Sequence, residues 1–118
     1  MNIGIICDIK ENIPVAFLAI DYDENLLGYV SNNNELRLIL ETILDQDQLA
    51  IKVKESIDGK TIIRSEVVNK RDPYYLVAIN YILPSPWKIL GIRYEENSNI
   101  KKVLKQCDNY LEGLLNEQ

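Results

Sequence analysis

The sequence predicts an α+β fold in which a mostly antiparallel sheet of five to seven strands carries two helices packed on one face. Two segments have apolar residues at helical spacing, and several short segments rich in isoleucine, valine and tyrosine are separated by turn residues. With 118 residues, the chain is long enough for one hydrophobic core and too short for two. We therefore expect a single domain over residues 1–118.

The chain begins with two apolar segments that predict neighbouring strands. Residues Asn2–Ile9 are rich in isoleucine, and residues Ile13–Tyr22 resume this pattern after a short polar turn. Residues Leu26–Val30 also fit a strand, although so short a segment does not decide between a strand and a loop. If it is a strand, the acidic residues before it form the tip of a hairpin.

A helix is predicted to begin after Asn32. The short polar side chain of Asn32 suits a helix cap because it can accept hydrogen bonds from the free amides of the first turn, and Glu35 completes a variant of the capping box. The apolar residues that recur at helical spacing are Leu36, Ile39, Leu40, Ile43 and Leu44. We expect the helix to end within residues 45–48.

Residues 49–94 predict three or four strands joined by short turns. Asp58-Gly59 has the sequence of a two-residue hairpin turn, in which glycine adopts a positive φ without steric cost. The segment Tyr74–Leu83 is apolar throughout, which is typical of a central strand. Trp87–Tyr94 follows a Pro-Ser-Pro connection and is predicted as a further strand.

The clearest helical pattern lies at the end of the chain. Its apolar residues are Ile100, Val103, Leu104, Cys107, Tyr110, Leu111, Leu114 and Leu115. The polar face is basic at the start and acidic at the end, opposite to the preference of the helix dipole. Two arrangements would compensate for this: antiparallel packing beside the acidic end of the first helix, or pairing with the same helix of a second copy in a homodimer.

The residue types present exclude several kinds of chemistry. The chain has no histidine, and therefore no imidazole base or imidazole metal ligand. Cys7 and Cys107 each lie in an apolar segment, without the close spacing of a zinc site, so we expect buried structural thiols. No glycine-rich phosphate-binding motif is present. We expect no cofactor, no metal and no enzymatic activity.

Charge is unevenly distributed along the chain. The whole chain has a net charge of −5, whereas residues 51–93 contain eight basic and four acidic side chains. The basic and aromatic residues that we expect on the surface of this sheet are Lys52, Lys54, Arg64, Tyr74, Tyr81, Trp87 and Arg93. The acidic residues that could form a separate contact patch are Asp21, Asp23, Glu24, Glu41, Asp45 and Asp47.

These features predict a non-enzymatic protein that binds another protein through a sheet surface, an edge strand or the acidic patch, as an inhibitor or immunity-like protein would. The alternative is a protein that binds a small anionic ligand with its basic, tyrosine-rich sheet. Interleaved cations and aromatic rings also occur in single-stranded nucleic-acid binders, but the net negative charge opposes a polyanion. No apolar segment approaches the roughly 18 residues of a membrane span, and no signal peptide is evident, so we expect a cytoplasmic protein.

Overall fold

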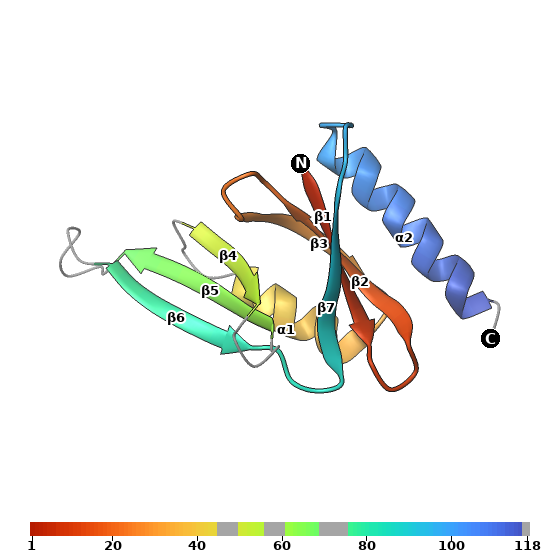
Figure 1. Ribbon diagram of the computed structural model, residues 1–118, viewed down its shortest axis with the longest axis horizontal. Helices are drawn as coiled ribbons and strands as arrows, with labels where there is room; N and C mark the ends of the chain where they lie inside the picture. Colours follow the sequence, from red (N-terminus) through yellow and green to blue (C-terminus); the bar gives the residue numbers. More distant parts are fainter. Residues whose placement is uncertain (45–49, 56–60, 69–75, 117–118) are drawn as a thin grey trace.

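Within residues 1–44, 50–55, 61–68 and 76–116, which the computed structural model describes, the chain forms seven strands and two helices (Figure 1). Their bounds are β1 (Asn2–Asp8), β2 (Ile13–Ile20), β3 (Leu26–Ser31), α1 (Asn34–Leu44), β4 (Ala50–Glu55), β5 (Thr61–Val68), β6 (Leu76–Ile82), β7 (Trp87–Tyr94) and α2 (Ile100–Asn116). The predicted α+β class is confirmed, and the short segment that only fitted a strand is β3.

The strands form two antiparallel sheets, so the predicted single sheet of five to seven strands is wrong. The first sheet has four strands in the order β3-β2-β1-β7, and the second has three in the order β4-β5-β6. Between β6 and β7 lie Pro84 and Pro86, which lack the amide hydrogen that a sheet ladder needs. The chain therefore leaves the second sheet there and returns to pair with β1.

The two helices pack on opposite faces of the four-stranded sheet, which corrects their predicted placement on one face. On β2, Leu18 and Ile20 belong to the core beside α1, whereas Phe17 and Ala19 belong to the core beside α2. Successive side chains of a strand point to opposite faces. A helix can pack on each face of the sheet because β2 is apolar on both faces, as expected for a strand that is covered on both sides.

The hydrophobic core is accordingly divided in two by the four-stranded sheet. The α1-side core consists of Ile6, Val15, Ala16, Leu18, Ile20, Leu26, Leu36, Leu40, Ile43, Ile63, Leu83 and Trp87. The α2-side core consists of Ile3, Phe17, Ala19, Val103, Cys107 and Leu111. Both cysteines are free and buried, as predicted, and removal from water raises the pKa of each thiol.

Thr61, at the start of β5, joins the two sheets. The residue is only 2% exposed. Its carbonyl accepts a hydrogen bond from the Leu83 N–H at 2.9 Å, and its Oγ1 accepts one from the Ile89 N–H, also at 2.9 Å. Because Leu83 follows β6 and Ile89 lies in β7, these bonds hold the three-stranded sheet against the four-stranded one.

Each helix begins at an asparagine. Asn33 Oδ1 accepts a hydrogen bond from the Leu36 N–H at 3.0 Å, so the cap of α1 is Asn33 rather than the predicted Asn32. Asn99 Oδ1 accepts one from the Lys102 N–H at 3.2 Å and caps α2 in the same way.

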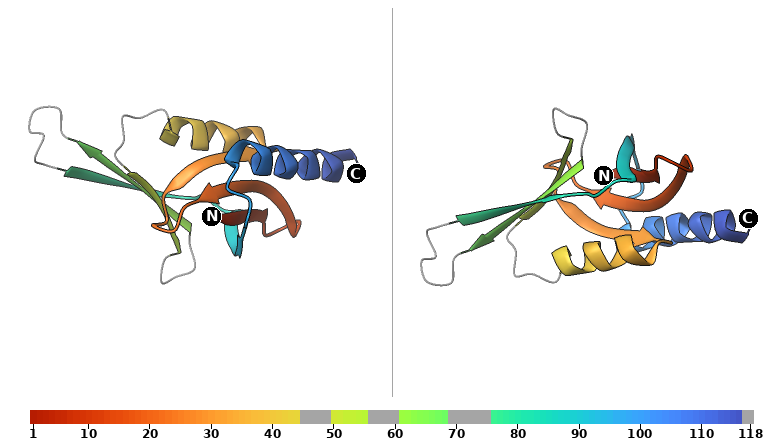
Figure 2. Two further views of the ribbon diagram at one scale, coloured as in Figure 1. Left: turned by 90° about the horizontal axis from the view of Figure 1, so that it is seen from above. Right: turned by 90° about the horizontal axis from the view of Figure 1, so that it is seen from below.

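The helices do not pack side by side in the antiparallel manner that would bring their unlike charges together. They cover opposite faces of the sheet. The C-terminal end of α1 points away from α2 (Figure 2). Pairing of α2 with a second copy stays a prediction. Neither helix in the described part of the chain is long and apolar enough to span a bilayer.

The predicted hairpin around Asp58-Gly59 is supported by the strands on either side of it. β4 and β5 pair antiparallel, with Glu55 opposite Thr61 at the end nearest the turn. The turn itself lies outside the described residues.

Candidate docking edge and adjoining cavity

The residues predicted to form a basic surface are spread over both sheets. In the three-stranded sheet, the register places Lys52 opposite Arg64 and Lys54 opposite Ile62, so the three cationic positions adjoin one another on β4 and β5. Arg64 is partly exposed, and Tyr74 lies outside the described residues. The binding of an anion by these three cations stays a prediction.

The other residues of that predicted surface lie elsewhere. Tyr81 is opposite Ile63 in the register and packs against the α1-side core. Trp87 is 8% exposed and belongs to the same core, so its indole face is not open to a nucleic-acid base. Arg93 lies on β7, in the other sheet. These three side chains therefore do not form one platform with the cations of β4 and β5.

A turn accounts for part of the predicted acidic patch. Asp21 Oδ1 accepts hydrogen bonds from the N–H groups of Asp23 and Asn25, both at 2.9 Å, and its Oδ2 accepts one from Asn25 Nδ2 at 3.1 Å. These bonds stabilise the turn between β2 and β3, where Glu24 has a positive φ of 68°. The Asp21 carboxylate therefore has a structural role, while Asp23 and Glu24 are exposed.

The remaining acidic residues of the patch belong to a different part of the chain. Glu41 is exposed on α1. Asp45 and Asp47 lie outside the described residues. The described part of the patch is therefore distributed over a turn and a helix.

β7 is an edge strand, and part of its backbone points away from the sheet. In the four-stranded sheet it pairs only with β1. The Glu95 N–H donates to the Met1 carbonyl at 2.8 Å, and the Met1 ammonium donates to the Glu95 carbonyl at 3.5 Å, so these residues form a hydrogen-bonded pair. Hydrogen-bonded and non-hydrogen-bonded pairs alternate along an antiparallel ladder. The N–H and C=O groups of Tyr94 and Ile92 therefore point to the open edge.

A β-bulge limits the regular part of this edge. The register of β7 against β1 is regular over Gly91–Tyr94, which lie opposite Asn2–Ile5, and it shifts at Leu90. A bulge bends the strand and interrupts the ladder. Gly91–Tyr94 is therefore the segment to which a further strand could pair.

The side chains along this segment are apolar and exposed on one face. Ile92 is 59% exposed and Tyr94 is 62% exposed. Both lie on the face away from α2, because Ile92 is opposite Gly4, which is itself opposite Leu18 of the α1-side core. Next to them lies the exposed Tyr22, and its interaction with Tyr94 raises the pKa of Tyr22.

We call this site the β7 edge surface. It consists of the backbone of Gly91–Tyr94 and the side chains of Ile92, Tyr94 and Tyr22. Sequence reasoning missed it because the outward direction of these groups depends on strand order. A partial signal was present in Trp87–Tyr94, which carries no acidic residue and is mostly apolar.

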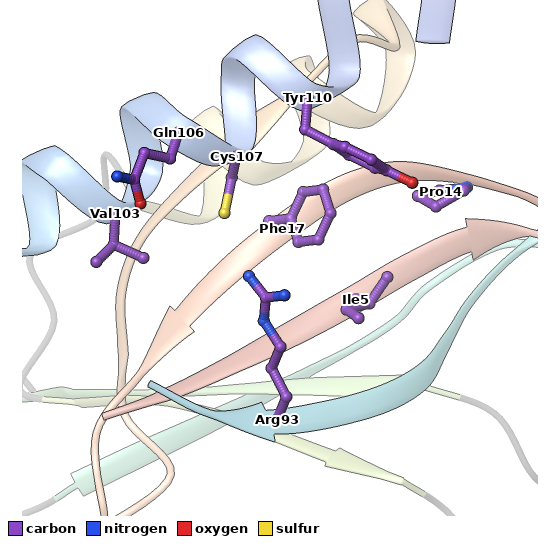
Figure 3. Close-up of a pocket in the computed structure, with 8 residues that line it drawn as sticks. All are labelled: Ile5, Pro14, Phe17, Arg93, Val103, Gln106, Cys107 and Tyr110. Carbon is purple, nitrogen blue, oxygen red and sulfur yellow. The ribbon is translucent and has the colours of Figure 1, made fainter. Parts of the chain in front are cut away.

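A cavity of about 330 Å³ lies on the other side of the sheet, between the sheet and α2 (Figure 3). Most of its lining is apolar and comes from Ile5, Pro14, Phe17, Val103 and Tyr110. The rings of Phe17 and Tyr110 meet edge to face, with centroids 5.9 Å apart and planes at 77°. Arg93, Gln106 and Cys107 complete the lining.

Arg93 is the charged group of this cavity. Its guanidinium extends from β7 toward Phe17 and Cys107 (Figure 3). Burial raises the pKa of the Cys107 thiol, the Arg93 charge acts in the opposite direction, and the Glu95 carboxylate adds a smaller upward effect. Within the described part of the chain, Arg93 forms no ion pair. The cavity therefore combines an apolar body with one cation that has no carboxylate partner among these residues.

Comparisons of the chain with protein families, characterised proteins and solved structures found no match. A functional proposal therefore rests on the geometry around β7.

Proposed function

We propose that the chain is a non-enzymatic protein-binding module that accepts an extended segment of another protein at the β7 edge surface. The observation that carries this proposal is the outward direction of the Ile92 and Tyr94 backbone groups, next to their exposed side chains. A strand added there would pair with those N–H and C=O groups, as in other cases of strand addition to a sheet edge. Alternate side chains of the added strand would cover the side chains of Ile92, Tyr94 and Tyr22.

Charge favours a different protein over a second copy of this chain. A two-fold arrangement that pairs Ile92 of one copy with Tyr94 of the other is centred on Arg93. The two Arg93 side chains would then lie directly opposite each other, and like charges in that position are destabilising. An acidic residue of another protein would instead pair with Arg93. We therefore expect the bound segment to have an acidic residue between two apolar ones.

Inhibition of another macromolecule is the specific form of this function that fits the charge pattern. The exposed acidic side chains of Asp23 and Glu24 lie outside the β7 edge surface and would be free to contact a basic partner. In an inhibitor of this kind, the β7 edge surface would pair with the backbone of the partner. The acidic turn would supply longer-range electrostatic attraction to a basic partner.

The proposal can be tested with a phage library of linear random peptides selected against the full chain. The selected peptides should perturb the NMR amide signals of residues 91–94, and their sequences should contain an acidic residue flanked by apolar ones. Methylation of the peptide amides that face β7 should abolish binding, because those amides donate to the Ile92 and Tyr94 carbonyls. Methylation of the alternate amides should leave binding within about two-fold, a shift that corresponds to roughly 0.4 kcal/mol.

A matched pair of variants tests the surface itself. Ile92→Lys places a charge within the β7 edge surface and should weaken binding of the selected peptides at least ~10-fold, because a lysine is disfavoured in an apolar contact. Leu27→Lys changes an apolar residue that is 43% exposed on β3, the opposite edge strand, and should leave binding unchanged. Equal loss in both variants, or peptides whose signals map away from β7, would contradict the proposal.

A further inference from the structure

We propose that the cavity between α2 and the four-stranded sheet binds a small monocarboxylate with an apolar body, such as a medium-chain or aryl carboxylate. This site goes beyond the proposed docking function: it lies on the α2 face, whereas Ile92 and Tyr94 lie on the other face, and the two sites share only Arg93. It is also separate from the cationic positions Lys52, Lys54 and Arg64 on β4 and β5.

Size and lining define the apolar part of the ligand. The cavity measures about 330 Å³, which is at the lower end of the range for small-molecule sites, about 300–1,000 Å³. Phe17 and Tyr110 form an edge-to-face aromatic wall, and Ile5 and Val103 line it beside them. An alkyl chain or a single aromatic ring therefore fits.

Charge defines the head group. Arg93 is an exposed residue whose guanidinium extends toward this apolar space, and it forms no ion pair within the described part of the chain. A guanidinium presents two parallel N–H donors that match the two oxygens of a carboxylate. The neighbouring Glu95 forms no ion pair with Arg93 in the described part of the chain, and its Oε1 accepts a hydrogen bond from the Asn97 N–H at 3.2 Å. One cation beside an apolar cavity matches a ligand with one negative charge.

The geometry of α2 keeps this site accessible. Cys107 and Val103 face the sheet and are buried, whereas Gln106 and Tyr110 lie at exposed positions of the helix and line the same cavity. The cavity is therefore open at a rim that includes these two side chains. A ligand can enter there without separation of α2 from the sheet.

Octanoate and 1-octanol are suitable probes because they share an alkyl chain and differ in charge. We expect octanoate to bind the full chain, with NMR shift changes at Val103, Cys107 and Tyr110, and to bind at least ~10-fold more tightly than octanol. Arg93→Gln should weaken octanoate binding at least ~10-fold and leave octanol binding within about two-fold. Gln106→Trp changes an exposed position and narrows the rim of the cavity, so it should weaken the binding of both octanoate and octanol.

Lys105→Gln is the matched control, because it removes one positive charge from the exposed surface of α2, away from the cavity lining. It should leave octanoate binding unchanged. The proposal is overturned if octanoate causes no shift at the cavity residues, if octanol binds as tightly as octanoate, or if Lys105→Gln weakens octanoate as much as Arg93→Gln. Ile92→Lys, which disables the β7 edge surface, should not affect octanoate, so failure of one proposal can be distinguished from failure of the other.

Discussion

Replacement of Thr61 with valine should weaken the junction between the two sheets with little change in side-chain shape. Valine has no oxygen, so the Ile89 N–H loses the acceptor that it now has at 2.9 Å. A buried donor without a partner costs about 1–3 kcal/mol. Because this donor is only partly buried, water can replace part of the bond, and we expect a loss of about 1–2 kcal/mol in the free energy of unfolding.

Urea unfolding and amide hydrogen exchange together measure this effect. With a urea m value of about 2 kcal/mol/M, the middle of the usual range, the unfolding midpoint of Thr61→Val should fall by about 0.5–1 M. Exchange of the Ile89 amide should accelerate by more than the change in global stability explains. Thr61→Ser is the control: it loses a methyl group, which costs about 0.8 kcal/mol, but it keeps the Oγ acceptor, so the Ile89 amide should stay protected. Equal protection of Ile89 in the two variants would refute this reasoning.

Three further outcomes follow from burial and from the shifted pKa values. Leu111→Ala, at 0% exposure, should cost about 2–5 kcal/mol in urea unfolding, whereas Leu115→Ala, at 49% exposure, should stay within about 0.5 kcal/mol. Tyr94→Phe removes the hydroxyl whose interaction raises the pKa of Tyr22, so absorbance titration should show Tyr22 ionising at lower pH. The stability linked to this interaction is present below the ordinary tyrosine pKa and is lost as pH rises through the raised value. Burial raises the pKa of the Cys107 thiol, so alkylation at pH 8, followed by mass spectrometry, should be slower in the folded than in the urea-unfolded chain.

Most elements of this fold could be predicted from local patterns, because both helices have a strong periodicity and most strands are apolar segments bounded by turn residues. The apolar stripe of α2 is the clearest case, since Val103, Cys107 and Leu111 are the residues that it buries. The cap of α1 is one residue later than predicted, because neighbouring asparagines offer the same side-chain acceptor and the sequence does not distinguish between them.

The arrangement of the elements could not be predicted in the same way, because strand pairing depends on contacts between distant residues. β7 pairs with β1 rather than with its neighbour in sequence, β6. This single pairing divides the strands into two sheets, leaves Ile92 and Tyr94 at an open edge and directs Arg93 toward α2. Arg93 was a candidate binding residue in the sequence, but its expected partners, Lys52 and Lys54, belong to the other sheet.

The bulge at Leu90 also has a consequence for aggregation. An exposed apolar edge strand can act as a template for open-ended stacking of further strands, and the segments that form such fibrils are about six or seven residues long. The regular part of β7 beyond the bulge is limited to Gly91–Tyr94 and carries the charge of Arg93. It can therefore accept one short strand and is too short to nucleate a fibril, which is a protection that a straight β7 would lack.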